Sequence, residues 1–345
     1  MGQSGQVTTS TRIVLASRPH GEPTDDNFRT EHVELPEPAD GEALLQTLYL
    51  SLDPYMRGRM SDAKSYAAPV EIGAVMVGAT VSRVLRTASD AVSEGDIVLG
   101  YGGWQSHSVE KVAHLRRIDP GAGVPVSTAL GVLGMPGFTA YAGLRNIGRP
   151  QPGETVAVAA ATGPVGSAVG QIARLKGART VGIAGGPDKV AYAKELGFDV
   201  ALDHRSETFA DDLKEAVPGG IDVYFENVGG AVWDAVLPRL NPFARVPVCG
   251  LVAGYNATSL PEGPNRAPAL MGAILSKSLL VRGFIQTEFA AEQTPDFLRD
   301  MTGWIADGSV QYREDIVDGL DQAIEAFRGL LKGRNFGKLV VRVSE

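Results

Sequence analysis

The sequence is poor in the residues that form crosslinks or bind metals. Its 345 residues include a single cysteine, Cys249. One cysteine excludes a disulfide within the chain and any zinc site built mainly from cysteine. The five histidines are His20, His32, His107, His114 and His204. None of them has a paired spacing such as His-x-x-x-His, so we expect no metal site, and we take the cytoplasm as the expected compartment.

The sequence also lacks basic runs and long apolar runs. Lysine and arginine number 32 and aspartate and glutamate 40, which gives a formal net charge of −8. This charge disfavours nucleic acid and anionic membrane surfaces as partners. No apolar run approaches the roughly 18 residues that a spanning helix needs. Met1–Thr11 has no apolar stretch of the kind found in secretory signals, and its Gly, Gln, Ser and Thr residues predict a frayed tail.

What is present divides the chain into two patterns. The first ~130 residues hold short β-type runs with Gly and Pro between them, which is typical of a mostly antiparallel β domain. These runs are Arg12–Ala16, Glu42–Leu48, Ala74–Val84, Ile97–Gly100 and His107–Val112. From about Val132, strand patterns alternate with helical patterns, which predicts βαβ units around a parallel sheet. We therefore expect residues 131–310 to form one domain and residues 1–130 with 311–345 the other.

The second pattern can be divided into elements. The expected strands are Thr155–Ala160, Thr180–Ala184, Val200–Leu202, Ile221–Glu226, Arg245–Cys249 and Leu279–Ile285. Helical spacing follows the first strand from Val165 to Leu175, and Asp188–Leu196 predicts a further helix that Gly197 ends. A final helix, Leu320–Leu331, and a final strand, Lys338–Val343, are expected to return to the first domain.

A glycine-containing loop follows the first of these strands. Ala160-Ala161-Thr162-Gly163-Pro164-Val165-Gly166 places Ala161, Gly163 and Gly166 on the dinucleotide template G-x-G-x-x-G. The second position lets the backbone approach a pyrophosphate, and the third lets the helix pack close to the strand. Pro164 suits the first helical turn, and the helix N-terminus offers free N–H groups to phosphate. The alternative is a plain strand–turn–helix in which glycine serves packing alone.

The end of the next strand indicates which dinucleotide binds. NAD sites usually have an acidic residue about 20 residues after the loop, where it bonds the ribose 2′-OH. This chain has Ala184-Gly185-Gly186-Pro187 there, followed by Asp188 and Lys189. Small residues leave room for a 2′-phosphate, Lys189 supplies a cation, and Arg205 is a candidate for a second. We therefore predict NADPH, although Lys189 could also be an ordinary solvated lysine.

Two devices that activate alcohols or ketones are missing. The sequence gives no sign of a zinc site, and no tyrosine has a lysine four residues later. A less demanding hydride acceptor, a C=C bond conjugated to a carbonyl, then becomes attractive. Charge would develop on the carbonyl oxygen, where one or two hydrogen-bond donors can stabilise it.

Six segments now carry a resemblance to a known family. They are Tyr49–Arg57 (YLSLDPYMR), Gly134–Tyr141 (GMPGFTAY), the nucleotide loop, Tyr224–Gly230 (YFENVGG), Cys249-Gly250 with Tyr255-Asn256, and Gly333–Lys338 (GRNFGK). The chain resembles the zinc-independent medium-chain dehydrogenase/reductases, in the branch of prostaglandin reductase (leukotriene B4 12-hydroxydehydrogenase), 2-alkenal reductases and curcumin reductases. The resemblance implies an α/β fold with a doubly wound Rossmann domain and a partly open β-barrel-like (GroES-like) catalytic domain. It also implies an active site in the cleft and a homodimer joined near Leu279–Ile285.

The resemblance implies a function and the residues that serve it. The function is NADPH-dependent reduction of α,β-unsaturated ketones or aldehydes, with Tyr255 and the cofactor ribose beside the enolate oxygen and a proton from solvent. The implied cofactor contacts are Gly163, Pro164, Val165, Gly166, Lys189, His204, Asn227, Cys249, Gly250, Tyr255, Phe284, Ile285 and Asn335. The implied substrate contacts are Tyr55, Met135 and Tyr255. Two positions depart from the family pattern, because His204 stands where tyrosine is common and Pro247 interrupts a strand.

Other interpretations of the same residues stay open. Tyr255 could be a half-buried tyrosine, Tyr55 a rim aromatic, Met135 core filler and Cys249 a small buried hydrophobe. Asn335 could serve a turn. At the level of the whole protein, the alternatives are an NADPH quinone reductase, a non-catalytic NADPH-binding protein, and a flavin enzyme that a colourless preparation would exclude.

Overall fold

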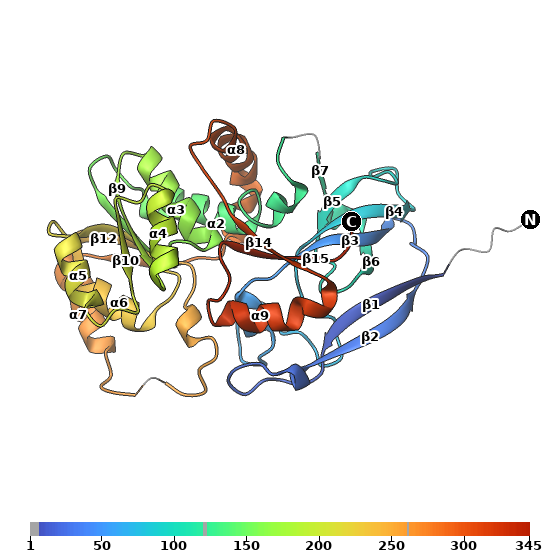
Figure 1. Cartoon of the computed structure of the whole chain (residues 1–345), viewed down its shortest axis with the longest axis horizontal. Coiled ribbons are helices and arrows are strands. Elements are labelled where there is room, and N and C mark those ends of the chain that lie inside the picture. The colour runs from blue at the N-terminus through green and yellow to red at the C-terminus, as the bar shows by residue number, and fades with distance from the viewer. Residues whose placement is uncertain (1–6, 120–122, 261) are drawn as a thin grey trace, which may run out of the picture. The chain divides into compact units, whose positions relative to one another are not determined.

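The protein is described here from a computed structural model, which describes residues 7–119, 123–260 and 262–345 (Figure 1). The chain divides into two compact units. The sheet unit comprises the described parts of Met1–Gly131, with Glu314–Asn335 and Leu339–Glu345. The α/β unit comprises the described parts of Val132–Arg313, with Phe336–Lys338.

The sheet unit is built mainly from antiparallel strands. Its strands are β1 (Thr8–Leu15), β2 (Phe28–Leu35), β3 (Glu42–Ser51), β4 (Thr80–Thr87), β5 (Ile97–Gly100), β6 (His107–Lys111), β7 (Arg116–Ile118), β14 (Glu314–Asp318) and β15 (Lys338–Arg342). β1 and β2 form a two-stranded sheet, and a seven-stranded sheet has the order β14-β15-β3-β4-β5-β7, with β6 also paired to β3. The β-rich character expected for this part of the chain is confirmed.

One aromatic group ties the C-terminal helix to this unit. The indole of Trp104 stacks on Phe28 at 5.7 Å between ring centroids and meets the edge of Phe327 at 5.5 Å. Phe327 lies on α9 (Ala323–Leu331), and all three rings are buried. The contact accounts for the return of the C-terminal helix, because α9 covers its apolar face only by packing on the N-terminal strands.

The expectation of a frayed tail up to Thr11 is wrong for the part of it that is described. Thr8–Leu15 is β1, and it pairs with β2 in antiparallel register from Thr8 opposite Leu35 to Leu15 opposite Phe28. Residues 1–6 lie outside the described residues. The β-branched threonines of this segment favour a strand. The sequence pattern does not predict the partner strand β2, which follows about 20 residues later.

The α/β unit contains a doubly wound parallel sheet. Its strands are β8 (Thr155–Ala159), β9 (Arg179–Ala184), β10 (Val200–Asp203), β11 (Ile221–Phe225), β12 (Leu240–Val248) and β13 (Leu280–Gly283). Its helices are α2 (Met135–Gly143), α3 (Pro164–Leu175), α4 (Pro187–Glu195), α5 (Phe209–Ala216), α6 (Gly230–Val236), α7 (Ala267–Lys277) and α8 (Thr287–Ala306). The strand order β10-β9-β8-β11-β12-β13 reverses direction between β8 and β11, as in Rossmann folds, and the predicted fold class is confirmed.

Alternate side chains of β8 supply two separate cores. Val156 and Val158 pack with α2, α3 and α8, whereas Ala157 and Ala159 pack with α5 and α6. Both faces of the sheet are therefore covered by helices, which Figure 1 shows around β9, β10 and β12. A central strand covered on both faces needs a continuous apolar run, which β8 has from Val156 to Ala159.

A short C-terminal segment belongs to the α/β unit although its neighbours in sequence belong to the sheet unit. The Arg313 guanidinium lies 3.9 Å from the centroid of the Phe336 ring, and Phe336 meets Tyr192 of α4 edge-on at 5.1 Å. The Lys338 N–H donates to the Arg313 carbonyl at 2.9 Å. Gly337 has φ of +79°, and a Cβ there would lie 2.3 Å from the same carbonyl, so this turn requires glycine.

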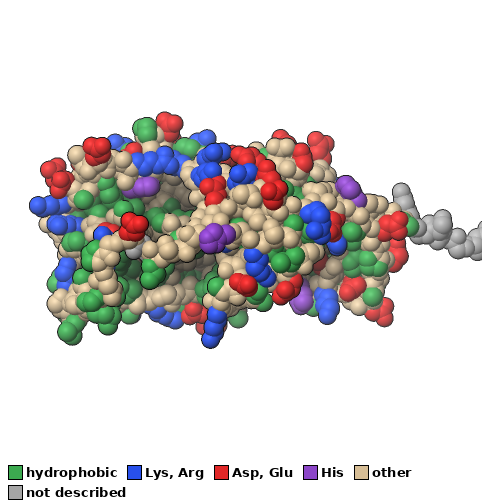
Figure 2. Space-filling model, turned by 90° about the horizontal axis from the view of Figure 1, so that it is seen from below, with side chains coloured by type: hydrophobic (Ala, Val, Ile, Leu, Met, Phe, Trp, Pro, Cys, Tyr) green, Lys and Arg blue, Asp and Glu red, His purple; other side chains and the backbone are tan. Residues whose placement is uncertain are grey.

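The surface charge and the character of the helices complete the description of the fold. Acidic and basic side chains are intermingled over the face shown in Figure 2. Among the described residues, no helix combines the length and the apolar character needed to cross a membrane.

Candidate active site

The nucleotide loop packs tightly against the end of β8. A Cβ at Gly166 would lie 2.2 Å from the Ala160 carbonyl oxygen and 2.8 Å from its carbon, so the helix approaches the strand at a distance that only glycine permits. Ala160 itself adopts a left-handed conformation with φ of +53°. Gly163 is the N-cap of α3 and Pro164 its first residue. The free N–H groups at the start of α3 therefore border this loop.

Cationic side chains gather at the end of the second strand. A Cβ at Gly185 would lie 2.9 Å from His204 Nε2 and 3.0 Å from Arg205 Nε. The pKa of the His204 imidazole is lowered, first by desolvation and then by the charge of Arg205, with a smaller effect of the same sign from Lys189. The structure thus places the side chains of His204 and Arg205 against Gly185, and Lys189 is near enough to His204 to influence its pKa.

One acidic residue lies beside this group. Asp203 ends β10, and its Oδ1 accepts hydrogen bonds from the N–H groups of Gly186 and Arg205, both at 2.9 Å. The bond from Gly186, and then that from Arg205, lowers the pKa of this carboxyl. Asp203 thereby holds the turn after β9 in place through backbone amides.

The ends of β8 and β11 are linked by an asparagine. The Asn227 side-chain amide donates to the Ala159 carbonyl at 2.8 Å. Strand β11 neighbours β8 at the point where the strand order reverses. Ligands of doubly wound sheets bind outside the carboxyl ends of the strands at this point, and Asn227 lies at that edge of the sheet.

The segment from Cys249 to Tyr255 folds back onto the same loop. The N–H groups of Cys249 and Gly250 donate to the Glu226 carbonyl at 2.9 and 3.2 Å. A Cβ at Gly250 would lie 3.3 Å from the Tyr255 hydroxyl, so this hydroxyl is close to Gly250. Burial, and then the charge of Glu226, raises the pKa of the Cys249 thiol to about 12, which keeps it protonated. Cys249 is therefore a packing residue in character rather than a nucleophile.

Three further predicted residues lie in the α/β unit. Phe284 is buried and meets the ring of Phe225 edge-on at 6.1 Å, so its side chain belongs to the core. Ile285 follows it and donates its N–H to Glu288 at 2.8 Å. Met135 is partly buried at the start of α2, where its carbonyl accepts from the Thr139 hydroxyl at 2.7 Å.

Two predicted residues lie in the sheet unit. Tyr55 begins α1 (Tyr55–Arg59), and the Arg59 guanidinium lies 5.7 Å from its ring centroid. Burial, and then the nearby Asp53 charge, raises the pKa of the Tyr55 phenol well above its ordinary value. Asn335 directly precedes the segment that Arg313 and Tyr192 hold.

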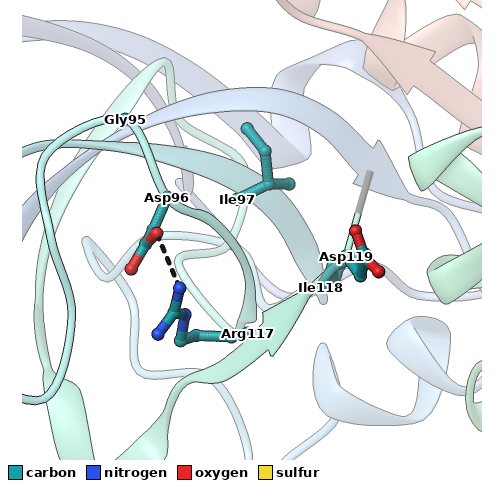
Figure 3. Close-up of a pocket in the computed structure, with 6 residues that line it drawn as sticks. All are labelled: Gly95, Asp96, Ile97, Arg117, Ile118 and Asp119. Atoms are coloured by element: carbon teal, nitrogen blue, oxygen red, sulfur yellow. Dashed lines mark hydrogen bonds and ion pairs between the residues drawn. The ribbon is translucent and has the colours of Figure 1, made fainter. Parts of the chain in front are cut away.

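The sheet unit also has a pocket. The pocket in Figure 3 lies in the sheet unit and is lined by Gly95, Asp96, Ile97, Arg117, Ile118 and Asp119. An Asp96–Arg117 ion pair of 3.1 Å lies on its wall, and none of the predicted site residues lines it. Within the part of the chain that the structure describes, no three His, Cys, Asp or Glu side chains are grouped as metal ligands would be.

The sequence analysis did not predict a role for Glu226, which forms several hydrogen bonds in this region. The side chain of Glu226 is 2% exposed, and its Oε1 accepts from Val228 N–H at 2.7 Å and Gly229 N–H at 2.9 Å. An acidic residue directly after the buried run Val223–Phe225 was the available signal, because a buried carboxylate needs donors.

Comparison with known proteins identifies the class of protein. Residues 11–118 match a family model described as the N-terminal domain of oxidoreductase, and residues 164–302 match one described as zinc-binding dehydrogenase. Together with the relatives below, these matches show that the chain belongs to the medium-chain dehydrogenase/reductase family, in the branch of the curcumin and prostaglandin reductases.

The particular relatives cover almost the whole chain. An NADPH-dependent curcumin reductase of Escherichia coli is 55% identical over 345 residues, which is 100% of this chain and 99% of the relative. Prostaglandin reductase 1 of Bos taurus is 42% identical over 93% of this chain and 95% of its own length. The crystal structure of CurA from Vibrio vulnificus in complex with NADPH superposes with a TM-score of 0.93 at 52% identity, over 97% of this chain and 99% of that one.

Gly166 provides a test of the close approach between α3 and β8. We expect Gly166→Ala to lower the unfolding free energy by about 2 kcal/mol, because the new methyl group meets backbone atoms that cannot rotate away. Thermal unfolding followed by circular dichroism measures the effect. Gly303→Ala on α8 is the matched control, since a Cβ there meets nothing within 4 Å. Equal unfolding temperatures for the two variants would show that the close approach is relieved at no cost.

Proposed function

We propose that the protein catalyses NADPH-dependent reduction of the C=C bond of α,β-unsaturated ketones and aldehydes. The observation that carries this proposal is the similarity over the full chain to an NADPH-dependent curcumin reductase. The geometry around the nucleotide loop and Gly185 supports it, because a dinucleotide with a 2′-phosphate needs both features. We retain the cytoplasm as the predicted compartment.

The residues present fit NADPH. The N-terminus of α3, with Gly163, Pro164, Val165 and Gly166, offers N–H groups to the pyrophosphate. The space beside Gly185, which a Cβ would fill, lies against Arg205 and His204, and with Lys189 these side chains would hold the 2′-phosphate. Asn227, Cys249, Gly250, Tyr255, Ile285 and the backbone of Phe284 would serve the nicotinamide half, and Asn335 is proposed for the same half.

Bound NADPH supplies the hydride for the β-carbon of the substrate. The Tyr255 hydroxyl would donate a hydrogen bond to the carbonyl oxygen, where negative charge develops as the enolate forms. Tyr255 is suited to this role because its side chain is held near Gly250 by the turn after β12. Tyr55 and Met135 would contact the substrate, and solvent would deliver the proton to the α-carbon.

A substrate panel with one variant tests this function. We expect the purified protein to oxidise NADPH with enones such as curcumin-type and alkenal compounds, followed by the loss of NADPH absorbance. Tyr255→Phe should lower kcat/KM on the order of 100-fold, which is the typical cost of losing one donor to a developing oxyanion. Its affinity for NADPH should change little, since the ring is kept.

The alternatives give different outcomes in the same experiment. Turnover of quinones without turnover of any enone would favour a quinone reductase. NADPH binding without turnover of either class would favour a non-catalytic binding protein. Full activity of Tyr255→Phe would remove this tyrosine from the mechanism and leave the rest of the proposal standing.

The choice between NADPH and NADH is tested at Lys189. We expect Lys189→Ala to weaken NADPH binding about 10- to 100-fold, because a hydrogen bond to a charged phosphate contributes about 1.5–3 kcal/mol. NADH, which lacks the 2′-phosphate, should bind the variant and the wild type almost equally. Fluorescence titration measures both, and Lys194→Ala on the exposed side of the same helix is the control. Equal losses for both nucleotides would contradict the role given to Lys189.

We also propose a homodimer formed through the edge of the parallel sheet. β13 is the last strand of that sheet in the described chain, so one of its sides is open to pairing. Leu280 on β13 is 39% exposed, and Met271 and Leu275 on the adjacent α7 are 63% and 84% exposed. A two-fold axis at β13 would join the two sheets and cover these residues.

The oligomeric state is tested by light scattering after size-exclusion chromatography. We expect a dimer for the wild type and a shift towards monomer for Leu275→Glu, because burying an unpaired carboxylate in an interface is costly. Leu175→Glu on α3, at a leucine that is 40% exposed away from β13, should leave the dimer intact. A monomeric wild type would contradict the proposal.

A further inference from the structure

The second half of the parallel sheet begins with an unusual buried carboxylate. Glu226 directly follows β11 and is 2% exposed, and the groups that donate hydrogen bonds to its Oε1 are neutral. Its Oε1 accepts the N–H groups of Val228 and Gly229 and, at 3.1 Å, the hydroxyl of Tyr224. Burying a carboxylate among neutral donors costs free energy, so its presence here calls for a local explanation.

The backbone of the same residue joins two neighbouring strand ends. The Glu226 N–H donates to the Pro247 carbonyl at 3.0 Å, and its carbonyl accepts from Cys249 and Gly250. The side chain therefore fixes the turn after β11, while the main chain fixes the end of β12. Asn227, which bonds to the end of β8, lies between these two sets of contacts.

The position in the sheet indicates which part of a dinucleotide this arrangement serves. A doubly wound sheet consists of two mononucleotide-binding halves that meet where the strand order reverses. The adenosine side is assigned to β8, β9 and β10, because the loop before α3 and the cations around Gly185 lie there. The half that starts with β11 is left for the nicotinamide.

We propose that Glu226 is a positioning residue for the nicotinamide end of the cofactor. Its carboxylate holds the turn of Asn227 to Gly229, and its backbone holds Cys249 and Gly250, so that both segments present a fixed surface to that half. The inference rests on the proposed function, because it concerns NADPH. Glu226 does not itself touch the cofactor in this assignment, and it takes no part in proton transfer.

Two ligands separate a positioning role from a general structural one. NADPH contains both halves, whereas adenosine 2′,5′-bisphosphate contains only the adenosine side with its phosphates. We expect Glu226→Ala to weaken NADPH on the order of tenfold, because the N–H groups of Val228 and Gly229 lose their acceptor. Binding of the bisphosphate, measured by isothermal titration calorimetry, should change by less than about twofold, which is below 0.5 kcal/mol.

Further variants keep the test decisive. Glu226→Gln retains an acceptor oxygen and should recover most of the NADPH affinity. Tyr224→Phe removes the hydroxyl bond while leaving both turn bonds, and should resemble the wild type. If Glu226→Ala does not fold, Glu226→Asp serves instead, because the shorter side chain draws the carboxylate away from the turn and should give the same ligand-dependent loss.

The outcomes distinguish this inference from the proposed function. Equal weakening of both ligands in the alanine or aspartate variant, or unchanged NADPH affinity, would overturn the role of Glu226. Wild-type binding of NADPH and reduction of enones would leave the function standing in either case. A wild-type protein that does not bind NADPH would overturn the function, and the inference with it.

Discussion

The constraint on which the α/β unit depends is the contact between Gly166 and the Ala160 carbonyl. Because a Cβ at Gly166 would lie 2.2 Å from that oxygen, α3 can begin directly above the end of β8 only with glycine at this position. The chain accepts a left-handed alanine at position 160 to make this turn. The Ala161 N–H then donates to Ile183, which ties the loop to β9. One close contact thus fixes the helix start, the loop and the neighbouring strand.

The turn after β11 lies next to the loop after β8, and different interactions hold it in place. After β8, close packing of glycine against backbone shapes the turn, whereas after β11 a buried carboxylate does so through hydrogen bonds. Asn227 joins the two regions through its bond to Ala159. Burial raises the pKa of Glu226, while the bonds from Val228 and Gly229 oppose that rise. The Asn227–Ala159 hydrogen bond therefore ties the turn after β11 to the end of β8.

The sequence predicted the elements whose stabilising residues are close together in the chain. The strand–loop–helix from Thr155 to Leu175 was predicted because its apolar run, glycines and helical spacing are adjacent in sequence. α8 was missed, since Pro295 lies inside it and proline usually ends a helix. The expected run Arg12–Ala16 gave the second half of β1, whereas its first half, expected to be a tail, is a strand because it pairs with β2 further along the sequence. The burial of Glu226 had a signal in the sequence, but its backbone bonds to the end of β12 and the stacking of Arg313 on Phe336 did not, because no spacing rule describes such contacts.

The sequence rule for the cofactor and the structure differ in where they place an acidic residue. The rule asks for an acid at the end of the second strand, where this chain has Gly185 and Gly186, and Asp188 lies further on in the first turn of α4. The structure nevertheless places a carboxylate nearby, that of Asp203 at the end of β10. Its Oδ1 is occupied by the N–H groups of Gly186 and Arg205, so it orders the turn that brings the Arg205 side chain to Gly185. The carboxylate of Asp203 thus orders the backbone at Gly186 and Arg205 through hydrogen bonds, which is a different role from that of the acid in the sequence rule.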